Sequence, residues 1–491
     1  MIINNLKWFH MSNFLKDFFE DTNKLCYIFL VLVLLCITAL VCWNANWTVG
    51  DDFQFITTTA IGRPSHANTF EGRFWPLGLC DYSILLFIPC GNTPLAHFIY
   101  NSIIMSAAVL LFFNSLTKIT NSASIALFTT IVLIFYSAFF RLHLQCIFSE
   151  IIIFFMLSVF MFCFFLRREK SFGFQFGAWL SATYAIFCKE PMFGLFLVFS
   201  VAGLLFYRKK PYDIALYCSI IFSSISYIAI YLYRLLFRVT VDRSYGDTFE
   251  TSKNLAYIFN TFILQIGNEP ILLLLFVVCS IRLSQMIKNR KVEFADILAL
   301  SGWSYIFAYT LLGAPFTAAY YCFPALAFIY PVFALIIKES DWKSLNKFSI
   351  GVVCCITCVC IYSVKYFQTN LNEIKTTFYN RKHDMPLVNA LAQKLCEGEK
   401  IVFISNANKC AEKDKAATIR LETFLTEMWN HFLTFTIGYK INQENGAKLQ
   451  DNIPNEKCIV ISNGSDYPNL HCIRTNCYGC NVFEYEPKPG E

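Results

Sequence analysis

The stretch LCYIFLVLVLLCITALV, residues 25–41, decides the fold, because it holds no charged side chain over its whole length. An α-helix of this length is long enough to cross the hydrocarbon core of a bilayer. The run continues into Val41-Cys42-Trp43, which offers no small-x-small cleavage site, and Val41 is too bulky to precede a lipidated cysteine. We therefore expect a retained first membrane helix.

The composition extends this expectation to most of the chain. Of 491 residues, 56% are hydrophobic and only 15% are charged. Soluble domains carry about 25% charged residues, so we expect an α-helical polytopic membrane protein. The net charge of +6 gives no reason to expect a nucleic-acid partner. About 11 apolar runs are candidate membrane helices, near residues 25–43, 95–115, 122–140, 147–166, 174–188, 191–207, 213–236, 267–283, 295–312, 318–337 and 348–365.

Basic residues predict the orientation of these helices. They gather in one alternate set of segments, at Lys7, Lys16, Lys24, Lys118, Arg167, Arg168, Lys170, Arg208, Lys209, Lys210, Arg282, Lys288, Arg290, Lys291, Lys338, Lys343 and Lys347. The positive-inside rule then places the N-terminus in the cytoplasm and the first loop, residues 44–94, outside. With an odd number of helices, the C-terminal end is also outside.

The chain therefore divides into a multi-span domain, residues 1–365, and an extracytoplasmic domain, residues 366–491. In the second domain, the short apolar runs at 401–405 and 459–462 are typical of buried parallel strands, and Leu421–Phe435 has helical periodicity. We expect a small α/β domain. In the first loop, Tyr82–Phe87 is too short to span, and we expect an interfacial helix there.

Asp51 and Asp52 follow the first apolar run by about ten residues, at the depth of the lipid headgroups. Paired acids in a loop can be a solvated turn. They can also divide the roles of a general base and an orienting group, or bind a divalent cation such as Mg²⁺ or Mn²⁺ through oxygen ligands.

The same loop carries Arg63, Glu71 and Arg73 among aromatic residues. The simple interpretation is an amphipathic loop whose aromatic side chains lie at the membrane interface. The functional interpretation is that Arg73, with Arg63, grips a phosphate through charge-assisted hydrogen bonds.

Further candidates lie at the other outer turns. Arg141, His143 and Glu150 surround the break before the run at 147–166, where an ionisable group marks either a functional site or a favourable helix start. At the next turn, Lys189 and Glu190 predict a local ion pair or a phosphate contact. Arg243, in a longer outer loop, is a candidate contact for the acceptor. Tyr320 and Tyr321 are either aromatic residues at the membrane interface or a platform on which a sugar stacks.

Six cysteines lie in the C-terminal domain, at Cys396, Cys410, Cys458, Cys472, Cys477 and Cys480. In an oxidising compartment such a set predicts disulfides, with fifteen possible pairings. A zinc site built on Cys477-x-x-Cys480 with His471 and Cys472 is the alternative, but no second CxxC completes it.

A first span, an outer loop that begins with an acidic pair, many further spans and an outer C-terminal domain together resemble the GT-C superfamily of membrane glycosyltransferases. The layout is also similar to phage-type glucosyltransferases that decorate bacterial O-antigen. The resemblance implies that Asp51 is the catalytic base, with Asp52 beside it. By location only, it makes Arg73, Arg141 and Lys189 candidates for binding the donor phosphate.

The resemblance implies an inverting transfer of a sugar, such as a glucose-type hexose, from a polyprenyl-phosphate donor to an outer-face glycan acceptor. It also implies a location in the bacterial inner membrane with a periplasmic C-terminal domain. No nucleotide cofactor is expected, since the sequence has no Gly-rich phosphate loop, and it also lacks HExxH and GxSxG.

Two other functions fit a chain of many spans. A flippase or transporter of lipid-linked sugars predicts charged residues in mid-span and internal repeats, and neither is evident. An O-antigen polymerase or ligase does not require an acidic pair after the first helix.

Overall fold

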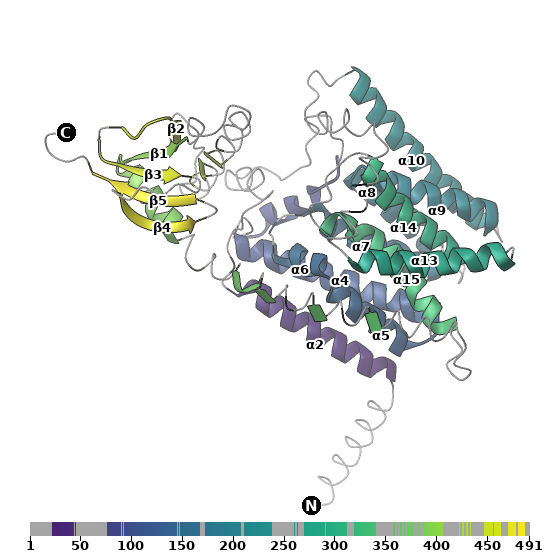
Figure 1. The fold of residues 1–491 in the computed structure, drawn as a ribbon. Helices are drawn as coiled ribbons and strands as arrows, with labels where there is room; N and C mark the ends of the chain where they lie inside the picture. Colours follow the sequence, from purple (N-terminus) through teal and green to yellow (C-terminus); the bar gives the residue numbers. More distant parts are fainter. Residues whose placement is uncertain are drawn as a thin grey trace, which may run out of the picture.

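The computed structural model describes residues 22–43, 45, 76–89, 91, 93–144, 146, 148–166, 172–207, 211–237, 260, 263, 270–289, 291–311, 319–339, 357–358, 361, 364–365, 368, 371–372, 374–376, 382, 386–405, 422, 425–426, 429–430, 433, 446–454, 456–462, 470–477 and 480–486. Most of the described chain is helical (Figure 1).

The helices are α2 (Thr22–Cys42), α4 (Pro94–Thr120), α5 (Ala123–Ile134), α6 (Ser137–Leu144), α7 (Ser149–Leu166), α8 (Phe172–Cys188), α9 (Met192–Phe206), α10 (Pro211–Phe237), α13 (Pro270–Asn289), α14 (Phe294–Leu311) and α15 (Phe323–Glu339). Two short 3-10 helices, η1 (Cys80–Phe87) and η3 (Ala319–Cys322), precede α4 and α15. These helices coincide with ten of the predicted apolar runs; the run at 348–365 lies mostly outside the described residues.

Five described helices are long and apolar enough to cross a membrane, and α5 with α6 would make a sixth if this bent pair is one span. The prediction of one continuous helix over residues 122–140 is wrong, because this range contains two helices, α5 and α6, which meet at an angle of 60°. At the break the N–H of Tyr136 bonds to the carbonyl of Leu133, three residues back, which tightens and ends α5. No proline or glycine marks this break in the sequence.

Side chains at the helix ends explain where α4 and α5 begin. Thr93 and Ser122 each accept a hydrogen bond from a backbone N–H in the first turn of the next helix, and Pro94 occupies the first position of α4. Asn121 adopts the left-handed conformation, with φ of 52°, and so closes α4 and turns the chain into α5.

Helix α15 lies in the centre of the helical domain and packs against α4, α5, α7, α13 and α14 (Figure 1). In its most apolar window 83% of residues are buried, against 28% for α2 and 33% for α10, which expose large apolar side chains. Aromatic rings fill the contact between α7, α9, α14 and α15, at Phe160, Phe164, Phe199, Phe294 and Phe328.

Helices α9 and α10 approach closely at Gly203. A Cβ atom on Gly203 would lie 2.5 Å from the ring of Tyr217, so only glycine fits there without a shift. Small residues at such positions allow membrane helices to pack by backbone contact.

The C-terminal domain contains one five-stranded sheet with the order β2-β1-β3-β5-β4. Its strands are β1 (Lys400–Ile404), β2 (Lys448–Gln450), β3 (Cys458–Ser462), β4 (His471–Cys477) and β5 (Cys480–Tyr485). Strand β1 is parallel to β2 and β3, whereas β5 is antiparallel to β3 and β4. The predicted pairing of two buried parallel strands is therefore confirmed.

The two faces of this sheet have different apolar neighbours. Ile401, Phe403, Ile459, Ile461 and Val482 pack with residues from helical segments, including Val388, Leu391, Trp429 and Leu433. Val402, Ile404, Val460 and Phe483 form a smaller cluster on the other face. The described residues between 422 and 433 are helical, which confirms the predicted helix at those positions. The domain is a small α/β unit.

Candidate active site

Four short segments at the ends of helices meet at one end of the helical domain: residues 76–89, 148–150, 187–189 and 320–321. We call the charged, polar and aromatic side chains at this place the outer-end cluster; its members are Asp81, Tyr82, Tyr100, Asn101, Phe148, Glu150, Lys189, Tyr320 and Tyr321. Under the predicted orientation, this end faces the outside.

An ion pair between Lys189 and Glu150 is the centre of the outer-end cluster. Glu150 lies in the first turn of α7 and Lys189 in the turn between α8 and α9, and Nζ of Lys189 donates to Oε1 of Glu150. Both side chains are largely buried, with exposed fractions of 11% for Lys189 and 2% for Glu150. The sequence singled out both residues, but it did not predict that they pair across 39 positions.

Aromatic rings surround the ammonium group of this pair. Nζ of Lys189 lies 4.7 Å from the centroid of the Tyr321 ring, which is a favourable cation–π distance. Tyr321 packs on Tyr320 with 4.5 Å between ring centroids, and Tyr320 packs on Phe148 at 4.7 Å. The cation therefore lies among desolvated rings with Glu150 as its counter-charge, and a charge in such surroundings acts strongly on a nearby anion.

The first outer loop returns to the helical domain beside Lys189. The N–H of Leu77 donates a 3.1 Å hydrogen bond to the carbonyl of Phe187, near the end of α8. Leu79 then adopts the left-handed conformation, with φ of 65°, which is unusual for a residue with a branched side chain. Arg73 precedes Leu77 by four residues in the sequence.

Two tyrosines and an asparagine connect this returning segment to α4 and α7. The hydroxyl of Tyr82 donates to Oδ1 of Asn101 at 2.8 Å and accepts from the N–H of Phe148 at 3.2 Å. The side-chain amide of Asn101 donates to the carbonyl of Cys146 at 2.8 Å. The ring of Tyr82 also contacts that of Tyr100, with 5.5 Å between centroids.

Asp81 is a buried carboxyl group that did not figure among the predicted site residues. The hydroxyl of Tyr100 donates a 3.0 Å hydrogen bond to its Oδ2. Burial raises the pKa of Asp81 to about 6, against the lowering effects of Tyr100 and of the nearby backbone amides of Asp81 and Tyr82. Its place beside an apolar stretch in the loop was the available sequence signal, and its burial was not evident from it.

Arg141, His143 and Glu190 lie in or near this region. Arg141 and His143 belong to α6, which packs against η3. His143 is buried, with Nδ1 at 2.7 Å from the carbonyl of Phe139, and its ring packs on that of Phe139. Arg141 is half-buried and Glu190 is buried. His143 is therefore held by its own helix, whereas Arg141 is only half-buried.

The other predicted site residues, Asp51, Asp52, Arg63, Glu71, Arg73 and Arg243, lie outside the described residues. Within the described part of the chain, no group of three or more His, Cys, Asp or Glu side chains could hold a metal ion. A divalent metal at Asp51 and Asp52 stays a prediction.

The cysteines of the C-terminal domain do not form the expected disulfides where they are described. Cys396, Cys458, Cys472 and Cys480 are free thiols; Cys410 lies outside the described residues, and of Cys477 only its position in β4 opposite Cys480 is described. Alternation along the strands explains the finding for Cys458 and Cys480, which point to opposite faces of the sheet.

A zinc site that combines Cys472 with Cys480 meets the same obstacle. Cys472 pairs in register with Phe483, so it lies on the opposite face from Cys480. Cys472 and Cys480 therefore do not converge as ligands of one metal ion.

A second, partly buried ionic cluster lies at the far end of α15. Arg282 of α13 donates to Asp296 at 3.0 Å and to Glu339 at 2.9 Å, and it also pairs with Glu293. Asp296 is fully buried in the first turn of α14, and Glu339 is in the last turn of α15. This cluster ties three helices together, and we assign it a structural role.

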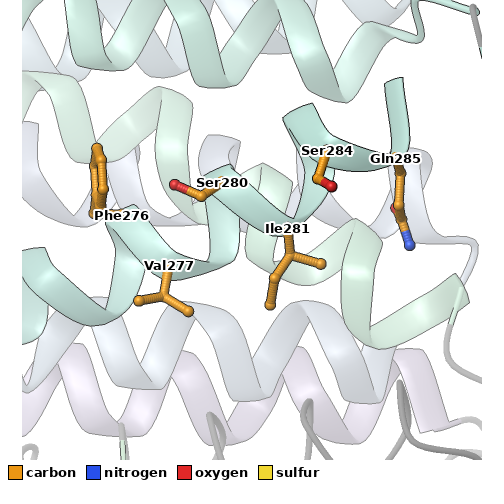
Figure 2. Close-up of a pocket in the computed structure, with 6 residues that line it drawn as sticks. All are labelled: Phe276, Val277, Ser280, Ile281, Ser284 and Gln285. Carbon is orange, nitrogen blue, oxygen red and sulfur yellow. The ribbon is translucent and has the colours of Figure 1, made fainter. Parts of the chain in front are cut away.

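The described residues that line a groove of about 530 Å³ all belong to α13 and are Phe276, Val277, Ser280, Ile281, Ser284 and Gln285 (Figure 2). None of these six residues is ionisable, and none belongs to the outer-end cluster. We therefore do not assign the chemistry to it.

The described chain combines a helical domain, in which several helices are long and apolar enough to span a membrane, with a small α/β domain, as the sequence predicts. Among solved structures, it is similar to ArnT from Cupriavidus metallidurans bound to undecaprenyl phosphate, with a TM-score of 0.51, 12% sequence identity, and 93% of this chain and 97% of that chain covered. At this identity the likeness concerns the fold.

The structure is also similar to the archaeal oligosaccharyltransferase AglB from Archaeoglobus fulgidus in complex with an inhibitory peptide and a dolichol-phosphate. Here the TM-score is 0.44 and the identity 11%, with 89% of this chain and 69% of that chain covered. No protein-family model matches the chain, and no curated protein matches it in sequence.

Proposed function

We propose that this protein transfers a sugar from a polyprenyl-phosphate donor to a hydroxyl group of an outer-face acceptor. The observation that carries the proposal is the buried Lys189–Glu150 pair, placed beside the returning end of the first outer loop. A cation held in a desolvated aromatic site suits a phosphate that stays at the membrane surface. ArnT, which has the same fold, was solved with undecaprenyl phosphate bound.

In the proposed reaction, Asp51 takes the proton from the acceptor hydroxyl and Asp52 orients it. The acceptor oxygen attacks the anomeric carbon from the face opposite the phosphate, so the configuration inverts as the bond to the phosphate oxygen breaks. Lys189, with Arg73 and Arg141, stabilises the negative charge that develops on the leaving phosphate. Glu150 holds the ammonium group of Lys189 in place.

A glucose-type hexose is the proposed sugar, and a glycan such as O-antigen is the proposed acceptor. The proposed location is a bacterial inner membrane, with the N-terminus in the cytoplasm and the C-terminal domain in the periplasm. The distribution of basic residues supports this orientation.

The test uses the full-length protein in nanodiscs, with synthetic undecaprenyl-phosphate-glucose as donor and purified O-antigen glycan as acceptor. We expect release of undecaprenyl phosphate together with sugar transfer. Asp51→Asn should lose turnover while still binding the donor, because the base is removed and the charge clamp is kept.

Lys189→Met should lower kcat about 100-fold, the usual loss when one group that stabilises the transition state is removed. Lys288→Met is the matched control, since Lys288 is an exposed lysine in the last turn of α13. Full activity of both Asp51→Asn and Lys189→Met would refute the proposal. In closed proteoliposomes, movement of labelled donor across the bilayer without sugar transfer would favour a flippase instead.

A further inference from the structure

We propose that Tyr82 and Asn101 are positioning residues that hold the start of α7, and with it Glu150, in place against Lys189. The inference rests on the proposed function in that Glu150 and Lys189 are taken as the phosphate-binding pair. The two residues link the first outer loop to this pair, although they come from η1 and α4.

Their hydrogen bonds reach the backbone just ahead of α7. Tyr82 accepts from the N–H of Phe148 at 3.2 Å, and Asn101 donates to the carbonyl of Cys146 at 2.8 Å. Tyr82 and Asn101 are joined to each other by a 2.8 Å bond from the tyrosine hydroxyl. The segment is therefore held at two backbone groups by two side chains that also fix one another.

Burial makes these bonds decisive for the position of the segment. Tyr82, Asn101, Cys146 and Phe148 all have exposed fractions of 5% or less, so water does not replace a lost partner. A buried donor or acceptor left without a partner destabilises its surroundings, and the backbone moves to relieve that.

Movement of this segment would displace both sides of the phosphate-binding pair. Phe148 precedes Glu150 by two residues, so it sets the first turn of α7. Its ring also packs on Tyr320, whose neighbour Tyr321 lies under the Lys189 ammonium. A shift at Phe148 therefore alters the carboxylate and the aromatic support of the cation together.

The chain supplies a matched control on the same helix. Tyr27 of α2 donates its hydroxyl to Oδ1 of Asn114 in α4, as Tyr82 does to Asn101. The amide of Asn114, however, donates to the carbonyl of Leu110 within α4 itself. Asn101 and Asn114 are thirteen residues apart along α4, about 20 Å. Tyr27→Phe thus removes the same kind of bond without touching the segment ahead of α7.

The experiment compares Tyr82→Phe, Asn101→Leu and Tyr27→Phe in the full-length protein in nanodiscs. Hydrogen exchange is followed in a peptide that covers residues 146–152. We expect exchange there to rise about fivefold in Tyr82→Phe and Asn101→Leu, as loss of a typical buried hydrogen bond predicts, and to stay unchanged in Tyr27→Phe. Equal exchange in all three variants and the wild type would overturn the proposal.

Kinetics then separate positioning from a general loss of folded protein. For Tyr82→Phe we expect kcat per folded molecule to fall about tenfold with KM for the donor nearly unchanged, because the phosphate is still bound but its developing charge is met less well. An unchanged kcat in a variant with raised exchange would also overturn the proposal. If Tyr82→Phe does not fold, Asn101→Leu carries both measurements.

The design distinguishes this inference from the proposed function. A wild-type protein without sugar transfer refutes the function, whereas the exchange result alone then decides whether Tyr82 and Asn101 hold the segment. A wild-type protein that transfers sugar, with variants identical to it, refutes only the positioning role.

Discussion

Glu150 and Lys189 form a buried ion pair that joins the first turn of α7 to the turn between α8 and α9. Removal of one partner from such a pair leaves an uncompensated buried charge, whereas removal of both does not. This asymmetry gives a test of the pair that is independent of catalysis.

We expect Glu150→Gln to lower the free energy of unfolding by about 3–5 kcal/mol, because the buried side chain of Lys189 is left without its ionic partner. The double variant Glu150→Gln with Lys189→Met should recover part of that loss while remaining inactive. The measurement is a double-mutant cycle on unfolding in detergent. Additive effects of the two substitutions would mean that the pair does not interact in solution.

Asp81 predicts a pH dependence of stability. Its pKa rises from 3.8 to about 6 on folding, so the folded state binds the proton more tightly than the unfolded state does. The resulting contribution, about 3 kcal/mol, is complete below pH 4 and is lost as the pH rises through about 6. Asp81→Asn stays neutral throughout.

The wild-type protein should therefore lose stability relative to Asp81→Asn between pH 4 and pH 7. Melting temperatures of both proteins across this range provide the measurement. A constant difference between the two melting curves would show that the carboxyl group does not change its pKa on folding.

The contact between α9 and α10 predicts that glycine is required at Gly203. Gly203→Ala should destabilise the protein by about 1–3 kcal/mol, because the new methyl group would lie 2.5 Å from the Tyr217 ring. Gly194→Ala is the control on the same helix, since a Cβ atom there meets only Ala308, at 3.9 Å. Thermal unfolding that ranks the two variants equally would contradict the packing at Gly203.

The free thiols of the C-terminal domain differ in predicted reactivity. Cys396 and Cys472 are exposed, whereas burial raises the pKa of both Cys458 and Cys480 to about 11. A maleimide at pH 7 should modify the first pair quickly and the second pair only after unfolding. Peptide mapping by mass spectrometry without reductant reads out all four, and a disulfide at any of them would contradict the structure.

The sequence predicts most helices of the fold, because long apolar runs report burial in lipid directly. It does not predict the break at Tyr136, where no glycine or proline interrupts the run. Likewise, the parallel pairing of β1 with β3 follows from two short apolar runs, whereas the antiparallel β5 between β3 and β4 does not.

For the site, residue type and loop position single out Glu150 and Lys189 individually. Their pairing depends on how α7 and α8 pack, which periodicity does not report. The hydrogen bond between Tyr82 and Asn101 also depends on packing, because the two residues are nineteen positions apart and neither is charged, so the sequence does not single them out. The structure contains no disulfide at Cys396, Cys458, Cys472 or Cys480. For Cys458 and Cys480 the reason is related, since a count of cysteines does not say which face of a sheet each thiol occupies.

The shielding of α15 by its neighbours has a consequence for the choice of lipid. Its 17 residues are covered by other helices and not by lipid, so a change in bilayer thickness does not act on α15 directly. Such a change should act on α2 and α10, because these helices expose large apolar side chains and can tilt to match the thickness of the bilayer. Lipids with shorter or longer acyl chains should therefore change the tilt of α2 and α10 and leave the position of α15 unchanged.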